Sequence, residues 1–159
     1  MTHVLFVCTG NICRSPLAES LFKRELAARS LEGIDVSSAG TGAWDGATAS
    51  EGALLVGLEQ NLDLSEHRAR LLTRDVVERS AVIFTMARHH RARVLELGGD
   101  DRTHVLGEYA GRAGPDAEVS DPFGGDIELY RATYEELDEL VRIAIGRLAN
   151  ELRDHPARE

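Results

Sequence analysis

Short apolar runs alternate along the chain with longer segments in which apolar residues recur every three or four positions. The runs are rich in β-branched and aromatic residues and too short for helices, so they predict buried parallel strands. These strands are expected at residues 4–7, 34–38, 81–85 and 105–106. The periodic segments predict helices from residue 16, at 48–60, at 74–79 with Thr73 as N-cap, at 87–97, and from 127 to about 153.

Two of these helices have an apolar face that would pack on the sheet. In the first helix this stripe comprises Leu17, Ala18, Leu21, Phe22 and Leu26. In the last helix it comprises Leu129, Tyr130, Leu137, Leu140, Val141, Ala144, Ile145 and Leu148. The acidic run at 135–139 indicates that the opposite side of the last helix faces solvent.

Strands that alternate with helices favour parallel pairing through right-handed crossovers. The order of elements therefore predicts a three-layer, doubly wound α/β fold with about four parallel strands flanked by helices. A length of 159 residues suits a single domain over residues 1–159. Binding sites in such folds lie at the carboxyl ends of the strands, so the segment after residue 7 is a predicted binding site.

This segment, residues 8–15, has the features of an anion-binding loop. Gly10 and Asn11 are residue types that adopt positive φ cheaply, which lets successive backbone N–H groups turn toward one point. Ser15 is a candidate N-cap, and Pro16 suits the first position of a helix. A strand, a tight loop and a helix N-terminus in this order predict a site for a dianion. The N–H groups expected to hold it belong to Thr9, Gly10, Asn11, Ile12, Cys13, Arg14 and Ser15.

A thiol stands beside this anion site. Inward-facing amides, a helix dipole and Arg14 all favour the thiolate form of Cys8, which is the nucleophile. Arg14 offers a rigid, two-pronged donor for two phosphoryl oxygens and stays charged. The spacing between Cys8 and Arg14 therefore predicts a sulfur that attacks a bound phosphoryl group. Ser15 is placed to donate its hydroxyl to that sulfur and to ease its departure as a leaving group.

The sequence VCTGNICRSPLAE at residues 7–19 resembles the phosphate-binding loop of the low-molecular-weight protein tyrosine phosphatase family. The resemblance extends to SAG at 38–40, HRAR at 67–70 and DPFG at 121–124, so it covers nearly the whole chain in the expected order. It implies a two-step phosphoryl transfer without a metal. In this reaction Cys8 is the nucleophile, Arg14 stabilises the transferred group, and Asp121 is the general acid and then the base.

The resemblance also implies supporting roles. Asn11, Ser38 and His67 would form the hydrogen-bond scaffold of the loop, while Trp44 and Phe123 would form two aromatic walls for a substrate ring. From the residues alone, a tryptophan in a Gly-rich loop can also fold onto nearby core. A lone histidine among charged neighbours is more often a solvated residue. Both alternatives stay open at this point.

The family includes a protein-arginine phosphatase subgroup, and the sequence has features of both substrate classes. Ile12 resembles the tyrosine-directed members, because an apolar side chain suits a flat ring, whereas the arginine-directed subgroup has threonine there. The segment FGGD at 123–126 resembles the arginine-directed subgroup instead. Because Ile12 and Trp44 would touch the substrate, phosphotyrosine on proteins is the predicted substrate and phosphoarginine the alternative.

Two other classes fit the sequence less well. A thiol-dependent arsenate reductase of this fold needs further cysteines downstream, and none follows Cys13. A non-catalytic phosphate-binding module would keep Arg14 and lose Cys8 or Asp121, yet both are present. Cys13 is expected either as a small buried loop residue or as a redox partner, whose disulfide with Cys8 would shield the nucleophile from irreversible oxidation.

Composition narrows the range of partners. A net charge of −9 should repel nucleic acid and anionic membrane surfaces, so neither is an expected partner. Two cysteines, no signal peptide pattern and no long apolar run predict a cytoplasmic protein, and we expect a monomer. No cluster of His, Cys and Asp has metal-ligand spacing, so no metal and no cofactor is expected. Phosphate-like oxyanions should inhibit the enzyme by occupying the loop.

Overall fold

The sheet consists of four parallel strands in the order β2-β1-β3-β4. The computed structural model describes residues 1–154. The strands are β1 (Thr2–Cys8), β2 (Ile34–Gly40), β3 (Val82–Thr85) and β4 (Thr103–Val105). β1 pairs with both β2 and β3, so Phe6 stands opposite Ser38 on one side and Phe84 on the other. The apolar run predicted at 4–7 is this central strand, which is buried on both faces.

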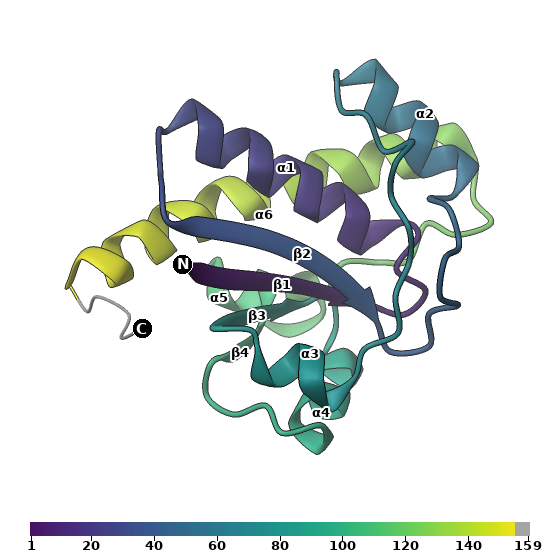
Figure 1. Ribbon diagram of the computed structural model, residues 1–159. Coiled ribbons are helices and arrows are strands. Elements are labelled where there is room, and N and C mark those ends of the chain that lie inside the picture. The colour runs from purple at the N-terminus through teal and green to yellow at the C-terminus, as the bar shows by residue number, and fades with distance from the viewer. Residues whose placement is uncertain (155–159) are drawn as a thin grey trace.

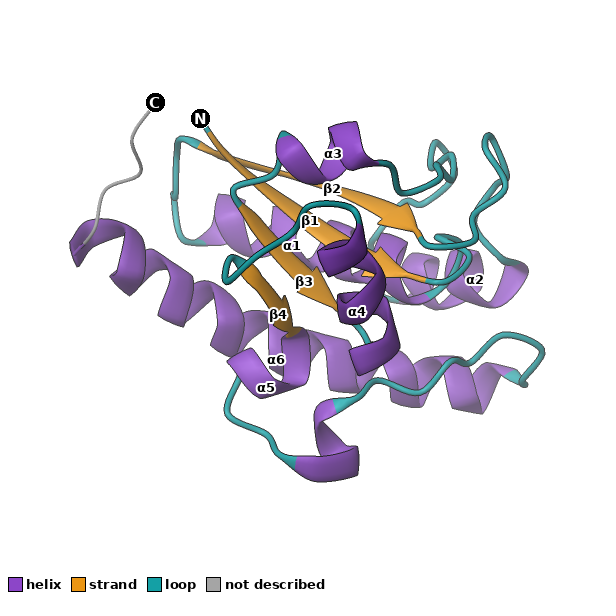
Figure 2. Cartoon of the chain, turned by 90° about the horizontal axis from the view of Figure 1, so that it is seen from below, coloured by secondary structure: helices purple, strands orange, loops and turns teal. Residues whose placement is uncertain are grey.

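Helices cover both faces of the sheet and form the three layers that the alternation predicted. α1 (Arg14–Ala28) and α6 (Ile127–Asp154) pack against each other over one face, and α2 (Glu51–Glu59) packs against α6 (Figure 1). Figure 2 shows α3 (Arg74–Glu78) and α4 (Arg88–Glu96) on the other face. The α/β fold class is therefore confirmed.

Two apolar clusters fill the space between these layers. The larger cluster, under α1 and α6, includes Phe6, Phe22 and Leu137, and the smaller one, on the side of α3 and α4, includes Leu5 and Val77. The predicted stripe of the first helix is buried throughout. The stripe predicted for the last helix is buried except at Leu129, which is 43% exposed.

The direction of winding reverses next to β1. The chain passes through α1 to β2 on one side of β1, and then crosses to β3 on the other side. Such a switch point opens a crevice at the carboxyl ends of the two diverging strands. The loop that follows β1 lies at this point.

Several element boundaries differ from the prediction. Cys13 rather than Ser15 is the N-cap of α1, so Pro16 is the third helical residue, where the N–H would also lack an intrahelical partner. Leu106 begins α5 (Leu106–Tyr109) instead of ending a strand. Residues 107–120, where no element was predicted, contain most of this helix and a 3₁₀ turn (Gly114–Ala117), because elements this short carry no periodic signal. The Thr73 cap is confirmed, since its hydroxyl accepts from the Val76 N–H.

The single domain over residues 1–159 stays a prediction, and residues 155–159 lie outside the described part of the chain. Across residues 1–154, no helix has both the length and the apolar character that crossing a bilayer requires.

Candidate active site

Residues 9–13 join the end of β1 directly to the first residue of α1. Asn11 has a φ of 56°, as its residue type predicted. Gly10 was also expected to have a positive φ, and it does not. β2 approaches the loop closely at Gly40. A Cβ there would lie 2.3 Å from the Thr9 carbonyl oxygen and 2.9 Å from the Asn11 nitrogen. Only glycine admits this approach, so the shape of the loop depends on β2 as well as on its own dihedral angles.

A cavity of about 230 Å³ opens over the loop. Its lining residues are Cys8, Thr9, Gly10, Ile12, Cys13, Arg14, Asp121 and Phe123. Of the residues predicted to bind phosphate, Asn11 and Ser15 are absent from this lining and are fully buried. The cavity thus combines a thiol, a guanidinium, a carboxyl and an aromatic ring, while the two buried residues support the loop from behind.

The hydrogen bonds behind the loop determine how the Ser15 hydroxyl points. The Arg70 N–H donates to Asn11 Oδ1 at 2.9 Å, so Asn11 Nδ2 must be the donor to Ser15 Oγ at 2.8 Å. Ser15 Oγ already accepts this bond, and its own O–H is free to donate to Cys8 Sγ, 2.9 Å away. A hydroxyl donor at this distance favours negative charge on the sulfur.

The same asparagine connects the loop to β2 and to the segment before Arg70. Asn11 Nδ2 also donates to Ser38 Oγ at 2.9 Å, and the Ser38 hydroxyl donates to Glu19 Oε1 at 2.6 Å. The His67 Nε2–H donates to the Asn11 carbonyl oxygen at 2.6 Å. The structure therefore brings the predicted scaffold together at Asn11. Sequence reasoning missed Glu19 and Arg70, although both lie within the motifs quoted above.

Arg14 is 5% exposed and only partly paired. Its Nη1 donates to the Val119 carbonyl at 2.9 Å, and its Nη2 lies 3.6 Å from Asp121 Oδ2. Among residues 1–154, its buried Nε has no hydrogen-bond partner. An unpaired buried N–H is costly, and the Nε edge of a guanidinium is suited to a bidentate phosphoryl group. The unpaired atom therefore indicates where an oxyanion fits.

Asp121 and Phe123 form the rim of the cavity opposite the loop. The Asp121 side chain is half exposed, and its Oδ1 accepts from the Phe123 N–H at 3.0 Å. Pro122 disfavours a helical conformation at the aspartate. Phe123 is 65% exposed and lines the cavity. A carboxyl at this rim is placed to exchange a proton with an ester oxygen held inside.

His90 is a buried partner of the loop that the sequence pattern did not reveal. The Ala87 N–H donates to His90 Nδ1 at 3.1 Å, so in the neutral ring Nε2 carries the hydrogen and donates to Thr9 Oγ1 at 2.8 Å. Burial, reinforced by the nearby charges of His89 and Arg14, lowers the pKa of His90 to about 3. The ring is therefore neutral near pH 7, and the Thr9 hydroxyl is free to donate into the cavity that it lines.

Cys13 has its own hydrogen-bond partners behind the cavity. Its Sγ lies 3.1 Å from Ser50 Oγ and 3.3 Å from the Tyr130 hydroxyl. Burial raises the pKa of the Cys13 thiol, and the hydrogen bonds from Ser50 and Tyr130 offset part of this effect. Burial also raises the pKa of Tyr130 to about 12. Cys8 and Cys13 are both free in this structure.

The structure does not bring Trp44 into the cavity, which corrects the prediction of two facing aromatic walls. Trp44 is 84% exposed, and it neither lines the cavity nor packs on the core. The adjacent residues explain this position. Asp45 Oδ1 accepts from the Leu71 N–H at 2.7 Å, and the Gly46 N–H donates to the Ala69 carbonyl at 2.8 Å. These bonds hold the loop beside residues 69–71 and leave the indole ring in solvent.

The fold and this site together define a class of enzyme. A loop after the central parallel strand holds Cys8 against a hydroxyl donor, with a partly unpaired arginine beside it and a carboxyl at the rim. These are the parts of a cysteine-dependent phosphatase. The family model for low molecular weight phosphotyrosine protein phosphatase matches residues 3–154, so the chain belongs to this family.

Relatives within the family carry two kinds of name. A protein-arginine-phosphatase from Geobacillus stearothermophilus is 36% identical over 153 residues, which is 95% of this chain and 96% of that protein. The low molecular weight protein-tyrosine-phosphatase PtpB from Staphylococcus haemolyticus is 37% identical over 142 residues, covering 87% and 94%. The solved YwlE arginine phosphatase from Geobacillus stearothermophilus superimposes with a TM-score of 0.86 at 33% identity over 100% of both chains. Identity alone therefore does not separate the two substrate classes.

Proposed function

We propose that this phosphatase hydrolyses phosphotyrosine on proteins through a cysteinyl-phosphate intermediate. The observation that carries the proposal is the unpaired, buried Nε of Arg14 in a cavity that also contains Cys8. A tetrahedral phosphoryl group would accept from this N–H while presenting its phosphorus to the sulfur.

In the first step the Cys8 sulfur attacks phosphorus and forms an S–P bond as the bond from phosphorus to the tyrosine oxygen breaks. Asp121 gives its proton to that oxygen, and Arg14 with the loop N–H groups stabilises the equatorial oxygens. In the second step Asp121 takes a proton from water, the water oxygen bonds to phosphorus, and the S–P bond breaks. The Ser15 hydroxyl, 2.9 Å from the sulfur, stabilises the thiolate that leaves.

The mechanism is tested with p-nitrophenyl phosphate in the absence of added metal. Cys8→Ser should abolish turnover, because the thiolate is the nucleophile. Asp121→Asn should lower kcat by about a hundredfold or more, and the phosphoenzyme should be trapped on rapid acid quenching. Asp126→Asn is the matched control, because this exposed carboxylate accepts from the Leu129 N–H outside the cavity and asparagine keeps that bond. Turnover by Cys8→Ser at the wild-type rate would refute the mechanism.

The preference for phosphotyrosine is supported by the apolar contacts of the cavity. Ile12 and Phe123 both line it, and a flat ring attached to the phosphoryl group would pack against such side chains. A chain named protein-tyrosine-phosphatase aligns over most of this sequence.

Phosphoarginine on proteins is the second candidate. A chain named protein-arginine-phosphatase aligns over 95% of this sequence. The exposed position of Trp44 leaves the tyrosine proposal without one of its two expected walls. The half-exposed Asp121 carboxylate at the rim would also pair with the guanidinium part of such a substrate.

A paired assay separates the two candidates. Peptides of one sequence carrying either phosphotyrosine or phosphoarginine are compared by kcat/KM. The wild type should prefer phosphotyrosine, and Ile12→Thr should shift the ratio toward phosphoarginine, because a hydroxyl suits a polar, planar group and its water. Phe123→Leu keeps an apolar side chain at the rim and controls for a general loss of packing. A wild-type preference for phosphoarginine would reverse our order of candidates.

We also propose that Cys13 protects the nucleophile. Peroxide would oxidise the Cys8 thiolate to a sulfenic acid, and the Cys13 thiol would displace water from it to form a disulfide that added thiol reduces. Inactivation by peroxide should therefore be reversible in the wild type and irreversible in Cys13→Ser. Equal recovery of both proteins would contradict this role.

A thiolate nucleophile needs reducing surroundings, so we propose that the enzyme works in the cytoplasm. Vanadate and phosphate should inhibit the enzyme competitively, because each is an oxyanion that would bind at the Nε edge of Arg14 in place of the substrate phosphoryl group.

A further inference from the structure

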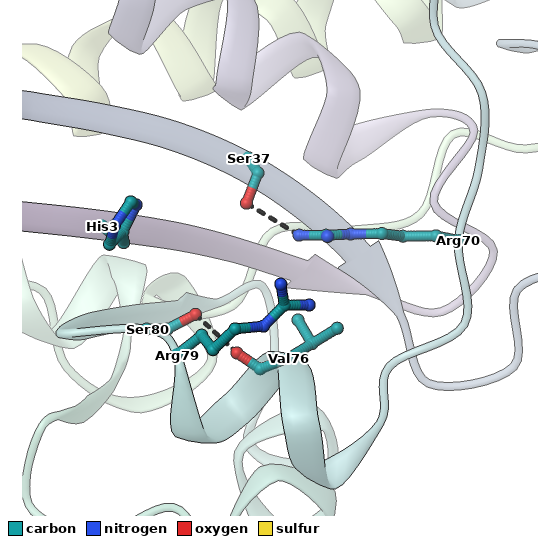
Figure 3. A pocket seen from close by; sticks show the side chains of 6 residues that line it. All are labelled: His3, Ser37, Arg70, Val76, Arg79 and Ser80. Atoms are coloured by element: carbon teal, nitrogen blue, oxygen red, sulfur yellow. Dashed lines mark hydrogen bonds between the residues drawn. The ribbon is translucent and has the colours of Figure 1, made fainter.

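A second cavity, of about 330 Å³, lies on the face of the sheet that carries α3, away from Cys8. Its lining side chains are His3, Ser37, Arg70, Val76, Arg79 and Ser80 (Figure 3). They come from β1, β2, the segment before α3, α3 itself and the residues that follow it. Three stretches of the sequence, at residues 3, 37 and 70–80, thus place two guanidinium groups, an imidazole and two hydroxyls around one space.

Positive charge in this cavity is incompletely compensated. Arg70 donates to two neutral oxygens, the Ser38 carbonyl at 2.9 Å and Ser37 Oγ at 2.8 Å. Burial and the nearby charge of Arg79 lower the pKa of Arg70, and the Glu19 carboxylate offsets only part of this effect. Within residues 1–154, no acidic side chain is among those that line the cavity.

Two carboxylates do pair with lining residues from outside. Asp75 Oδ2 lies 3.0 Å from Arg79 Nη2, and Asp35 Oδ1 lies 2.5 Å from His3 Nδ1. All four of these side chains are more than half exposed, so solvent screens both pairs strongly. Neither carboxylate therefore cancels the repulsion between Arg70 and Arg79.

We propose that this cavity is a second anion site, which binds a phosphate group between Arg70 and Arg79. A guanidinium has five N–H donors, and the two bonds of Arg70 leave three available. Ser37 Oγ accepts from Arg70, so its own hydrogen is free for an oxyanion. Ser80 differs, because its hydroxyl already donates to the Val76 carbonyl at 2.8 Å. A tetrahedral oxyanion with several acceptor oxygens matches this set of diverging donors.

The second cavity is connected to the loop that carries Cys8. Arg70, whose half-buried guanidinium lines this cavity, also donates its backbone N–H to Asn11 Oδ1. Arg70 Nε donates to the Ser38 carbonyl, and the Ser38 hydroxyl in turn accepts from Asn11 Nδ2. An occupant of the second cavity therefore contacts the same arginine that fixes the loop scaffold. The inference does not depend on the reaction proposed at Cys8.

Phosphate titration followed by ¹H–¹⁵N NMR of the full chain tests the proposal, because each cavity has its own reporters. The amide signals of Thr9 and Gly10 report on the first cavity, and those of Ser37 and Ser80 report on the second. Both sets should shift and saturate in the wild type. Chloride at matched ionic strength should not reproduce the shifts of the second set.

Arg79→Gln should weaken phosphate binding at the second set of signals by about tenfold, through loss of one charged donor, and leave the first set unchanged. Arg79 is exposed, so this variant should fold. Arg74→Gln is the matched control, because it removes a charge from α3 outside the cavity, and both sets should behave as in the wild type. Signals of Ser37 and Ser80 that do not move, that follow chloride equally, or that respond alike in Arg79→Gln and the wild type would overturn the proposal.

A phosphoserine peptide, compared with inorganic phosphate, identifies the source of the phosphate group. Binding of the peptide at the second set of signals would make a further phosphorylated side chain of the substrate the occupant. Binding of inorganic phosphate alone would make the free anion the occupant, and either result supports the site.

Discussion

Replacing Asn11 with alanine should destabilise the whole protein as well as slow the enzyme. Asn11 is fully buried at a φ of 56°, where its side chain makes three hydrogen bonds. Its Nδ2 donates at 2.8 Å to Ser15 and at 2.9 Å to Ser38, and its Oδ1 accepts from the Arg70 N–H at 2.9 Å. Alanine removes all three bonds and leaves the part-buried backbone N–H of Arg70 without its partner.

The magnitude follows from two separate costs. Three lost hydrogen bonds at about 1 kcal/mol each amount to about 3 kcal/mol. Alanine in the left-handed region adds about 1 kcal/mol, because asparagine tolerates this backbone conformation and alanine does not. The free energy of unfolding should therefore fall by about 4 kcal/mol, within a total of about 5 to 15 kcal/mol for a domain of this kind.

Urea unfolding followed by circular dichroism measures this loss of stability. Two matched variants separate the cost of the lost hydrogen bonds from the cost of the backbone conformation. Asn11→Gly removes the same bonds but keeps the left-handed conformation cheap, so it should lose about 1 kcal/mol less than Asn11→Ala. Asn61→Ala alters an exposed asparagine with a φ of 61°, and should lose only about 1 kcal/mol. In Asn11→Ala, kcat should also fall, because the Ser15 hydroxyl is no longer oriented toward Cys8.

Equal losses in Asn11→Ala and Asn61→Ala would refute the reasoning, since the buried bonds would then contribute nothing measurable. A greater loss in Asn11→Gly than in Asn11→Ala would refute the assignment of a separate backbone cost.

Two further predictions concern packing and protonation around the loop. Gly40→Ala should lower both stability, by about 2 kcal/mol, and kcat, because its Cβ would lie 2.3 Å from the Thr9 carbonyl oxygen. Gly42→Ala, whose Cβ would meet nothing closer than 4.0 Å, should match the wild type in urea unfolding and turnover, and similar effects of the two changes would contradict the close-approach argument. His90 has a pKa of about 3 when folded and 6.5 as its reference value, so the unfolded chain takes up the proton first and stability falls as pH drops below 6.5. Between pH 7 and pH 5 the wild type should lose about 2 kcal/mol more than His90→Gln, and parallel pH profiles of the two proteins would refute the assignment.

The layers of the fold could be predicted because burial leaves a periodic signal. The strand at 4–7 is apolar at every position since helices cover both sides of it, and the stripe of α1 repeats with the helical period. The end of β4 escaped prediction because Leu106 suits a strand and a short helix equally well. Pro16 and Ser15 led to a wrong N-cap because Ser15 bonds to Cys8 and Asn11 instead of to the helix.

The loop residues of the site could be predicted because they are contiguous and their chemistry is specific. Ser38, His67 and Asp121, which come from elsewhere in the chain, could be predicted only through the family resemblance, and partners outside its motifs were missed. His90 is one of two adjacent histidines at the start of α4, and only the fold shows that this ring reaches Thr9. The position of Trp44 was not predicted, because its loop is held beside residues 69–71 by the Asp45 side chain and by the Gly46 backbone, and the sequence does not show that these segments are neighbours.

The position of the nucleophile has a consequence for heat inactivation. Cys8 is the last residue of the central strand and Arg14 the first residue of α1, so the proposed nucleophile and the arginine beside it are held by two elements that pack into the larger apolar cluster. Local unfolding at the ends of the chain should leave Cys8 and Arg14 in place, and only cooperative unfolding of the core should separate them. Enzyme activity and native structure should therefore be lost at the same temperature.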